Sequence, residues 1–116
     1  MTWKPKHKYG ARRCEFDGLK FPSLLERDSF IQLKRLQQEG VVRFFLQQVP
    51  FRLPGLKKHQ VDFCVFTNEN VLFIEAKGKD LPMGALKRAQ CEDLADITIH
   101  VVKKASEIPA VIQEFG

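Results

Sequence analysis

The sequence predicts an α/β protein, in which a mixed central β-sheet is flanked by helices within a single domain. Segments with strand-like patterns alternate with helix-like ones along the chain, which favours a layered α/β arrangement. The 116 residues, 44% of them hydrophobic, are enough for one core but few for two domains. No apolar run approaches the roughly 18 residues that a membrane-spanning helix requires.

A β-hairpin followed by a helix is the first predicted unit. Residues 14–21 alternate apolar and polar side chains around Asp17-Gly18, a favoured two-residue hairpin turn. The helix then begins at Ser23, which has a glutamate three residues later, as in a capping box. Gly40 is a natural place for this helix to end.

The rest of the chain predicts strands interleaved with two further helices. The boundaries follow from apolar periodicity and from turn residues such as Gly, Pro and Asn. We expect extended structure over 41–53, broken at Pro50 and Pro54, strands over 61–66 and 71–76 around a turn at 67–70, a helix over 82–94, a strand over 97–102, and a last short helix from Ser106.

The positive charge of the chain is concentrated at its N-terminus. The net charge is +5, and the first thirteen residues carry five cations and no acid. We therefore divide the chain into a basic arm, 1–12, and one domain, 13–116. Such an arm is typical either of a contact with nucleic-acid phosphates or of a solubilising tail. The cations are Lys4, Lys6, Lys8, Arg12 and Arg13.

The cysteines and histidines do not indicate a zinc site or a disulfide framework. Cys14, Cys64 and Cys91 are odd in number and widely spaced, which favours reduced thiols in an intracellular protein. The three histidines, one of them His100, show no metal-ligand spacing, and we expect His100 to be a strand residue without a role.

The hairpin formed by 61–66 and 71–76 is expected to carry the chemistry. If 67–70 is its turn, Asp62 lies opposite Glu75 on the neighbouring strand. Two carboxylates facing each other in this way are about 5 Å apart at Cβ and repel each other. A divalent metal between them would remove this repulsion, because hard cations bind carboxylate oxygens.

The two faces of this hairpin are expected to differ in character. Side chains alternate between the faces of a sheet, so Lys77 points to the same face as Asp62 and Glu75. The opposite face lacks any polar side chain and is expected to be core. It consists of Val61, Phe63, Val65, Leu72, Ile74 and Ala76.

Glu26 has two interpretations. It lies on an apolar stripe of its predicted helix together with Phe30 and Leu33, and this stripe should face the body of the protein. In one interpretation its side chain returns to the Ser23 amide to complete the capping box. In the other it joins the two carboxylates of the hairpin.

These residues resemble a known nuclease pattern. Asp62, followed by Glu75-Ala76-Lys77 at the end of an apolar strand, resembles the D…ExK signature of the PD-(D/E)xK nuclease superfamily. An upstream helical glutamate is similar to that of the Holliday-junction resolvases in this superfamily. The resemblance extends to phage-associated endonucleases and spans residues 8–104, with Val61 in place of the proline before Asp62.

The resemblance implies a restriction-endonuclease-like fold and a magnesium- or manganese-dependent DNA endonuclease. Asp62, Glu75 and the Ala76 carbonyl would bind the metal, with Glu26 binding directly or through water. Lys77 would orient or deprotonate the attacking water. These roles suit phosphodiester hydrolysis, which needs an activated water and stabilised phosphate charge. The resemblance further implies branched DNA as substrate and a homodimer, because one small domain has one site and resolving a junction requires two cuts.

Other polar residues are candidates for contacts with DNA. Lys57, Lys58 and His59 form an expected basic loop before the Asp62 strand, and Lys87 and Arg88 lie on the following helix, as does Gln90. Gln47 and Gln48 are near a strand end. Two other functions remain open: a nicking or end-processing nuclease of the same chemistry, and a catalytically silent nucleic-acid-binding protein on a nuclease fold.

Overall fold

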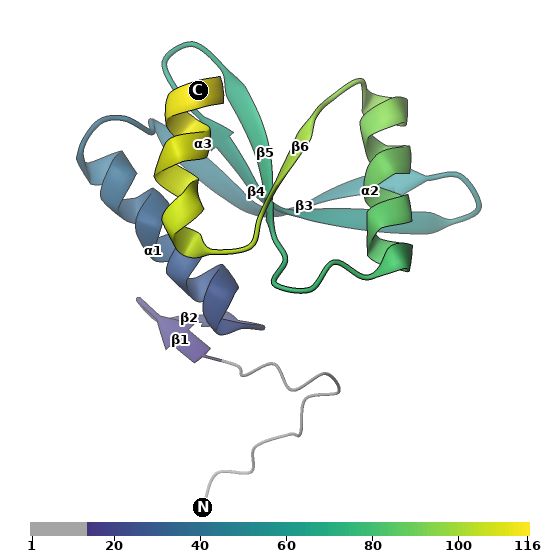
Figure 1. Cartoon of the computed structure of the whole chain (residues 1–116), viewed down its shortest axis with the longest axis horizontal. Coiled ribbons are helices and arrows are strands. Elements are labelled where there is room, and N and C mark those ends of the chain that lie inside the picture. The colour runs from purple at the N-terminus through teal and green to yellow at the C-terminus, as the bar shows by residue number, and fades with distance from the viewer. Residues whose placement is uncertain (1–13) are drawn as a thin grey trace, which may run out of the picture.

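The computed structural model describes residues 14–116 (Figure 1). The predicted contacts of the basic arm (Lys4, Lys6, Lys8, Arg12 and Arg13) lie outside these residues. The elements are β1 (Cys14–Phe16), β2 (Leu19–Phe21), α1 (Leu24–Gln38), β3 (Phe44–Leu53), β4 (Lys57–Phe66), β5 (Val71–Ala76), α2 (Pro82–Ala95), β6 (Ile99–Val102), the 3-10 turn η1 (Ala105–Glu107) and α3 (Ile108–Phe115).

The predicted first hairpin is confirmed. Phe16 pairs with Leu19 in an antiparallel register, and the two residues between them have positive φ angles, 54° at Asp17 and 78° at Gly18. Positive φ at both central positions is the requirement of the tight hairpin turn that matches strand twist. This two-stranded sheet lies against the N-terminal half of α1 (Figure 1).

Helix α1 begins and ends where the sequence predicts. The Ser23 hydroxyl accepts a hydrogen bond from the Glu26 backbone N–H at 3.1 Å, which satisfies one of the free donors of the first turn. Gly40 follows the helix with a φ of 83°, a conformation that glycine adopts without a steric penalty. The buried face of the helix contains Phe30, Leu33 and Leu36.

The main sheet has four strands in the order β3-β4-β5-β6. The first two pairs are antiparallel, and β5 and β6 are parallel and joined through α2. The predicted α/β class and mixed sheet are therefore confirmed. The β4–β5 register also agrees with prediction over the pairs from Phe66↔Val71 to Phe63↔Ile74.

Helices cover both faces of this sheet. Helices α1 and α3 lie on one side and α2 lies on the other (Figure 1). The larger core cluster joins α1 and α3 to the sheet, and the smaller one joins α2 to it. The smaller cluster consists of Leu53, Val61, Cys91 and Ile99. No helix within residues 14–116 combines the length and apolar character needed to cross a membrane.

Two predictions about β3 and β4 are wrong. Pro50 does not interrupt the extended segment, because β3 runs continuously through it and pairs Pro50 with Gln60. β3 is an edge strand, where a residue without an N–H is tolerated. The expected basic loop is also not a loop, since Lys57 and Lys58 begin β4.

The predicted alternation of side chains fails at Val61. Val61 packs in the α2 cluster, whereas Phe63, two residues later, packs in the α1 and α3 cluster. The pairing of β3 with β4 passes from Gln47↔Phe63 to Val49↔Val61, and Gln48, between these two pairs, has a φ of 52°. The regular strand geometry is interrupted at this level of the hairpin, where Val61 and Phe63 on β4 turn to different faces.

Candidate active site

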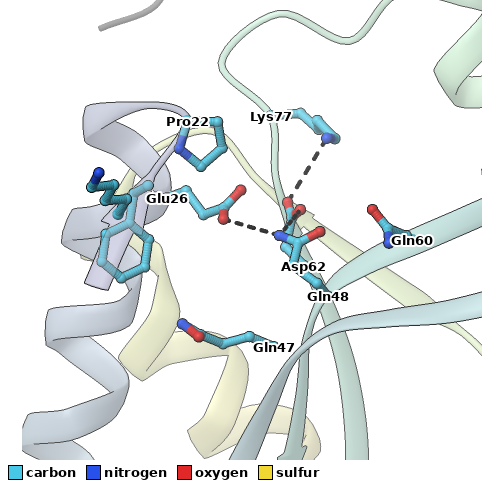
Figure 2. Close-up of a pocket in the computed structure, with 9 residues that line it drawn as sticks. Pro22, Glu26, Gln47, Gln48, Gln60, Asp62 and Lys77 are labelled. Atoms are coloured by element: carbon cyan, nitrogen blue, oxygen red, sulfur yellow. Dashed lines mark hydrogen bonds and ion pairs between the residues drawn. The ribbon is translucent and has the colours of Figure 1, made fainter. Parts of the chain in front are cut away.

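A pocket of about 360 Å³ opens where α1, β3 and β4 meet the segment that follows β5 (Figure 2). Its polar lining comes from segments far apart in the sequence. The polar side chains around it include Glu26 from α1, Gln47 and Gln48 from β3, Gln60 and Asp62 from β4, and Lys77.

The Glu26 side chain is directed to this pocket and does not complete the capping box. Its Oε2 atom accepts a hydrogen bond from Gln48 Nε2 at 3.0 Å, although the Ser23 hydroxyl still caps the Glu26 backbone N–H. Glu26 is buried, with 8% of its surface exposed. Of the two interpretations of Glu26, the structure therefore supports the one that places its carboxylate beside Asp62.

Asp62 is held on two sides. Its Oδ2 atom accepts from the Ala76 backbone N–H at 2.9 Å, and its Oδ1 atom accepts from Gln48 Nε2 at 3.4 Å. The Gln48 amide thus bridges the carboxylates of Glu26 and Asp62 (Figure 2). Lys77 Nζ lies 3.8 Å from Asp62 Oδ2. An ammonium group therefore stands beside one of the two acids.

The closeness of the two acids changes the protonation of Glu26. Burial, followed by the negative charge of Asp62 and a hydrogen bond with it, raises the pKa of Glu26 from 4.5 to about 7. The Lys77 charge and the Gln48 hydrogen bond act in the opposite direction but are weaker. The pocket therefore has a deficit of positive charge, and a bound cation would relieve it.

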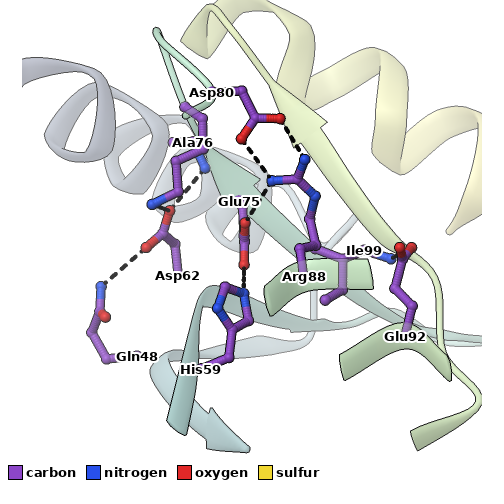
Figure 3. A network of polar contacts seen from close by, with 10 residues as sticks. Gln48, His59, Asp62, Glu75, Ala76, Asp80, Arg88, Glu92 and Ile99 are labelled. Atoms are coloured by element: carbon purple, nitrogen blue, oxygen red, sulfur yellow. Dashed lines mark hydrogen bonds and ion pairs between the residues drawn. The ribbon is translucent and has the colours of Figure 1, made fainter. Parts of the chain in front are cut away.

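Glu75 belongs to a separate, buried network (Figure 3). It is fully buried, and its Oε1 atom contacts His59 Nε2. Its Oε2 atom accepts from Arg88 Nη1 at 3.3 Å. Arg88 comes from α2 and forms a two-pronged contact with Asp80, in which Nη1 lies 3.1 Å from Oδ1. The two carboxylates are thus directed to different helices, Asp62 to α1 and Glu75 to α2.

The divergence of Asp62 and Glu75 has a local cause. The pairing of β4 with β5 ends at Phe63↔Ile74, one pair before Asp62 would face Glu75. There the Asp62 side chain, rather than a backbone carbonyl, accepts the Ala76 N–H. The expected common face of Asp62 and Glu75 is therefore wrong, although the register that predicted it is correct.

The structure brings together three of the four predicted catalytic residues: Glu26, Asp62 and Lys77 line one pocket. Glu75 is adjacent in sequence to Ala76, whose N–H binds Asp62. Within residues 14–116, no three acidic, histidine or cysteine side chains are close enough together to hold a metal ion. Two carboxylates are what the pocket itself offers to a cation.

The predicted DNA-contact residues are dispersed. Lys57 and Lys58 are exposed on β4, and Lys87 is half-buried on α2. The expectation that Arg88 faces solvent and contacts DNA needs correction, because its side chain is only 12% exposed and is bound to Glu75 and Asp80. Gln48, considered near the site from sequence, is central to it.

The contact of His59 with Glu75 does not follow from the sequence pattern. The pattern places His59 in a basic loop, and no spacing marks it as a partner of Glu75. Knowing where β4 begins would have identified it. Because Lys57–Phe66 is one strand, His59 and Val61 are two residues apart on it and point to the same face. That face packs against α2, which also brings Arg88 to Glu75.

No family model matches this chain, and no curated protein or solved structure shows significant similarity to it. The interpretation of the site therefore depends on its own geometry and on the sequence pattern described above.

Proposed function

We propose that this protein is a metal-dependent DNA endonuclease of the restriction-endonuclease-like fold, acting on branched DNA as a homodimer. One observation carries the proposal: Glu26 and Asp62, 36 positions apart in the printed sequence, converge on a single amide beside the Lys77 ammonium in an open pocket. Carboxylates brought together in this way cost stability, which favours a functional reason for the arrangement.

The donor set of the pocket fits a magnesium or manganese ion. Hard divalent cations bind carboxylate oxygens, and Glu26 and Asp62 supply these from two different elements. Such an ion, when bound, lowers the pKa of a water and stabilises negative charge on a phosphate. Glu75 would join Glu26 and Asp62 as a ligand only after exchanging its contacts with His59 and Arg88. The Ala76 carbonyl is the further ligand that the D…ExK resemblance implies.

The chain's own residues have distinct tasks in this proposal. Lys77 Nζ, close to Asp62, would hold a phosphate oxygen and the attacking water in line. Gln48 keeps the two carboxylates in place through its single donor group. The exposed cations Lys57 and Lys58, on the strand that carries Asp62, supply phosphate contacts.

Cleavage assays test the proposal. Four-way junction, flap, duplex and single-stranded DNA are incubated with the protein, with magnesium, with manganese and with chelator. We expect metal-dependent cutting, with the junction preferred. Cutting of simple duplex alone would indicate the nicking or end-processing alternative, and DNA binding without any cutting would indicate the silent binding protein.

A pair of lysine variants isolates the chemistry. Lys77→Ala should lower the rate by orders of magnitude while DNA binding remains, and Lys79→Ala is the matched control, because Lys79 is exposed and does not line the pocket. A folded Lys77→Ala protein that cuts at the wild-type rate would exclude Lys77 from the mechanism.

A further inference from the structure

The β3–β4 hairpin ends in a projecting tip, residues 52–58, that lies beyond α2 in the view of Figure 1. Leu53 pairs with Lys57 across the end of the hairpin, and Pro54, Gly55 and Leu56 form the turn between them. The three turn residues are exposed. The turn at the far end of the ribbon is therefore open to solvent, whereas Leu53 at the base of the turn is buried in the α2 cluster.

Leu56 at this tip is in an unfavourable position on two counts. Its φ is 62°, a left-handed conformation that β-carbon-bearing residues other than Asn and Asp rarely adopt. Its relative exposure is 103%, so a large apolar side chain is presented entirely to solvent. Glycine or asparagine would satisfy the turn at lower cost. A strained residue whose side chain packs against nothing within residues 14–116 suggests a contact outside them.

The tip is also strongly basic. Residues 40–61 contain Arg43, Arg52, Lys57 and Lys58 and no acidic residue. Arg52, Lys57 and Lys58 are exposed, and none of them forms an ion pair with another residue in the range 14–116. Three unpaired cations around one exposed leucine fit a polyanion that also offers apolar surface, a combination found in DNA with its stacked bases.

The tip is at a defined distance from the pocket. Gln48 and Gln60 line the pocket at the base of the ribbon, and Leu53 lies five residues beyond Gln48 on β3. At about 3.3 Å per residue this is a reach of about 17 Å. Leu56 lies just beyond Leu53 in the turn, so along duplex DNA its reach corresponds to about five base pairs or slightly more, at about 3.4 Å each.

We propose that the tip is a DNA-insertion element: Leu56 enters between bases or into a groove about five base pairs from the phosphate bound in the pocket, while Arg52, Lys57 and Lys58 contact the flanking phosphates. Two-stranded ribbons fit into DNA grooves, and apolar wedges unstack base steps in architectural DNA-binding proteins. Unstacking costs least where pairing is already disturbed, so the element would favour branched DNA. The inference rests on the proposed function in taking DNA as the polyanion.

Binding in chelator tests the insertion without involving cleavage. The probes are a duplex and a four-way junction that carry the fluorescent base 2-aminopurine at successive positions. With the wild type, we expect fluorescence to rise at one position, where the base unstacks. Leu56→Gly should abolish this rise and weaken binding about tenfold. Its melting temperature should be unchanged or higher, because glycine relieves the strained φ.

The cation contacts are tested by salt dependence. The double variant Lys57→Ala/Lys58→Ala should flatten the slope of log K against log salt by about two units, at about 0.9 per phosphate contact. Arg43→Ala is the matched control, since Arg43 is an exposed cation just before β3, at the end of the strand away from the tip. Equal slopes for the double variant and the wild type would overturn the proposal.

The remaining outcomes separate this inference from the proposed function. If Leu56→Gly binds DNA with the wild-type affinity and fluorescence, the insertion is wrong even if the protein cuts DNA. If Leu56→Gly instead abolishes self-association and leaves DNA binding intact, the tip is a protein contact and the insertion is again wrong. If the wild type binds no DNA at all, both the insertion and the proposed function are wrong.

Discussion

Replacing Glu26 by glutamine should stabilise the protein, and the gain should grow with pH. Burial and the neighbouring Asp62 charge raise the pKa of Glu26 from 4.5 to about 7. A group whose pKa is raised on folding holds its proton more tightly in the folded state, so ionising it costs stability as the pH rises from 4.5 through about 7. Glutamine is uncharged and does not incur this cost.

The magnitude follows from the same pKa difference. A rise from 4.5 to about 7 corresponds to about 3 kcal/mol of unfolding free energy when Glu26 is fully ionised. Nearly all of this is present at about pH 8, whereas less than about 1 kcal/mol remains at about pH 5. For a domain of this size, the melting temperature should rise by about 10 °C at the higher pH and by a few degrees at the lower.

The substitution is also suited to the geometry of the site. The glutamine carbonyl can accept the bond from Gln48 Nε2 that Glu26 Oε2 now accepts at 3.0 Å. Its amide can donate to the neighbouring Asp62 carboxylate, whose negative charge helps to raise the pKa of Glu26. We therefore expect no cavity and no unsatisfied polar group to offset the gain.

The assay is thermal unfolding of wild type and variant at several pH values, with chelator present. Glu69→Gln is the matched control, because Glu69 is exposed in the turn between β4 and β5 and its replacement should leave the stability within about 0.5 kcal/mol. A Glu26→Gln gain that is the same at both ends of the pH range would show that no carboxyl near Asp62 titrates around neutrality, and the reasoning would fail.

Three further predictions concern the metal, the arm and the buried network. Magnesium or manganese should raise the unfolding free energy by mass action, by about 2.7 kcal/mol at a hundredfold excess over Kd, and so raise the melting temperature. Asp62→Asn should abolish this gain and the exposed Asp93→Asn should keep it; an unchanged shift in Asp62→Asn would contradict the site. Deleting residues 1–8 should weaken DNA binding and flatten its salt slope by up to about three units if Lys4, Lys6 and Lys8 contact phosphate, and parallel slopes with equal affinity would identify a solvated tail. The Arg88 hydrogen bond lowers the pKa of Asp80, so Asp80→Asn should lower the unfolding free energy by up to about 1 kcal/mol at neutral pH. In unfolding curves this loss should disappear as the pH falls below 3.8. A loss that persists in acid would refute its ionic origin.

The sequence predicts the elements of the fold well where local rules act alone. The Asp17-Gly18 turn, the Ser23 cap and the β4–β5 register depend on residues close together in the chain, and all were anticipated. The errors occur where position in the sheet matters. Pro50 is accommodated only because β3 is an edge strand, a fact that no local pattern contains.

The sequence predicts which residues carry the candidate site, but not that Glu75 lies apart from the other three. Glu26, Asp62 and Lys77 do line one pocket. Strict alternation predicts Asp62 and Glu75 on the same face, but the alternation fails on β4, where Val61 and Phe63 pack into different core clusters. The Glu75 partners His59 and Arg88 come from β4 and α2, and such pairings depend on tertiary packing that spacing in the sequence does not reveal.

The position of Pro50 also bears on how the protein behaves at high concentration. In the part of the chain that the structure describes, β3 has a strand neighbour on one side only, and its length of ten residues makes it a long open edge. Open edges of this kind invite pairing between molecules and aggregation. A proline in the middle of the strand removes one backbone donor, and the irregular backbone at Gln48 prevents a flat, continuous template. The left-handed residue that lines the pocket therefore also disfavours edge-to-edge association through β3.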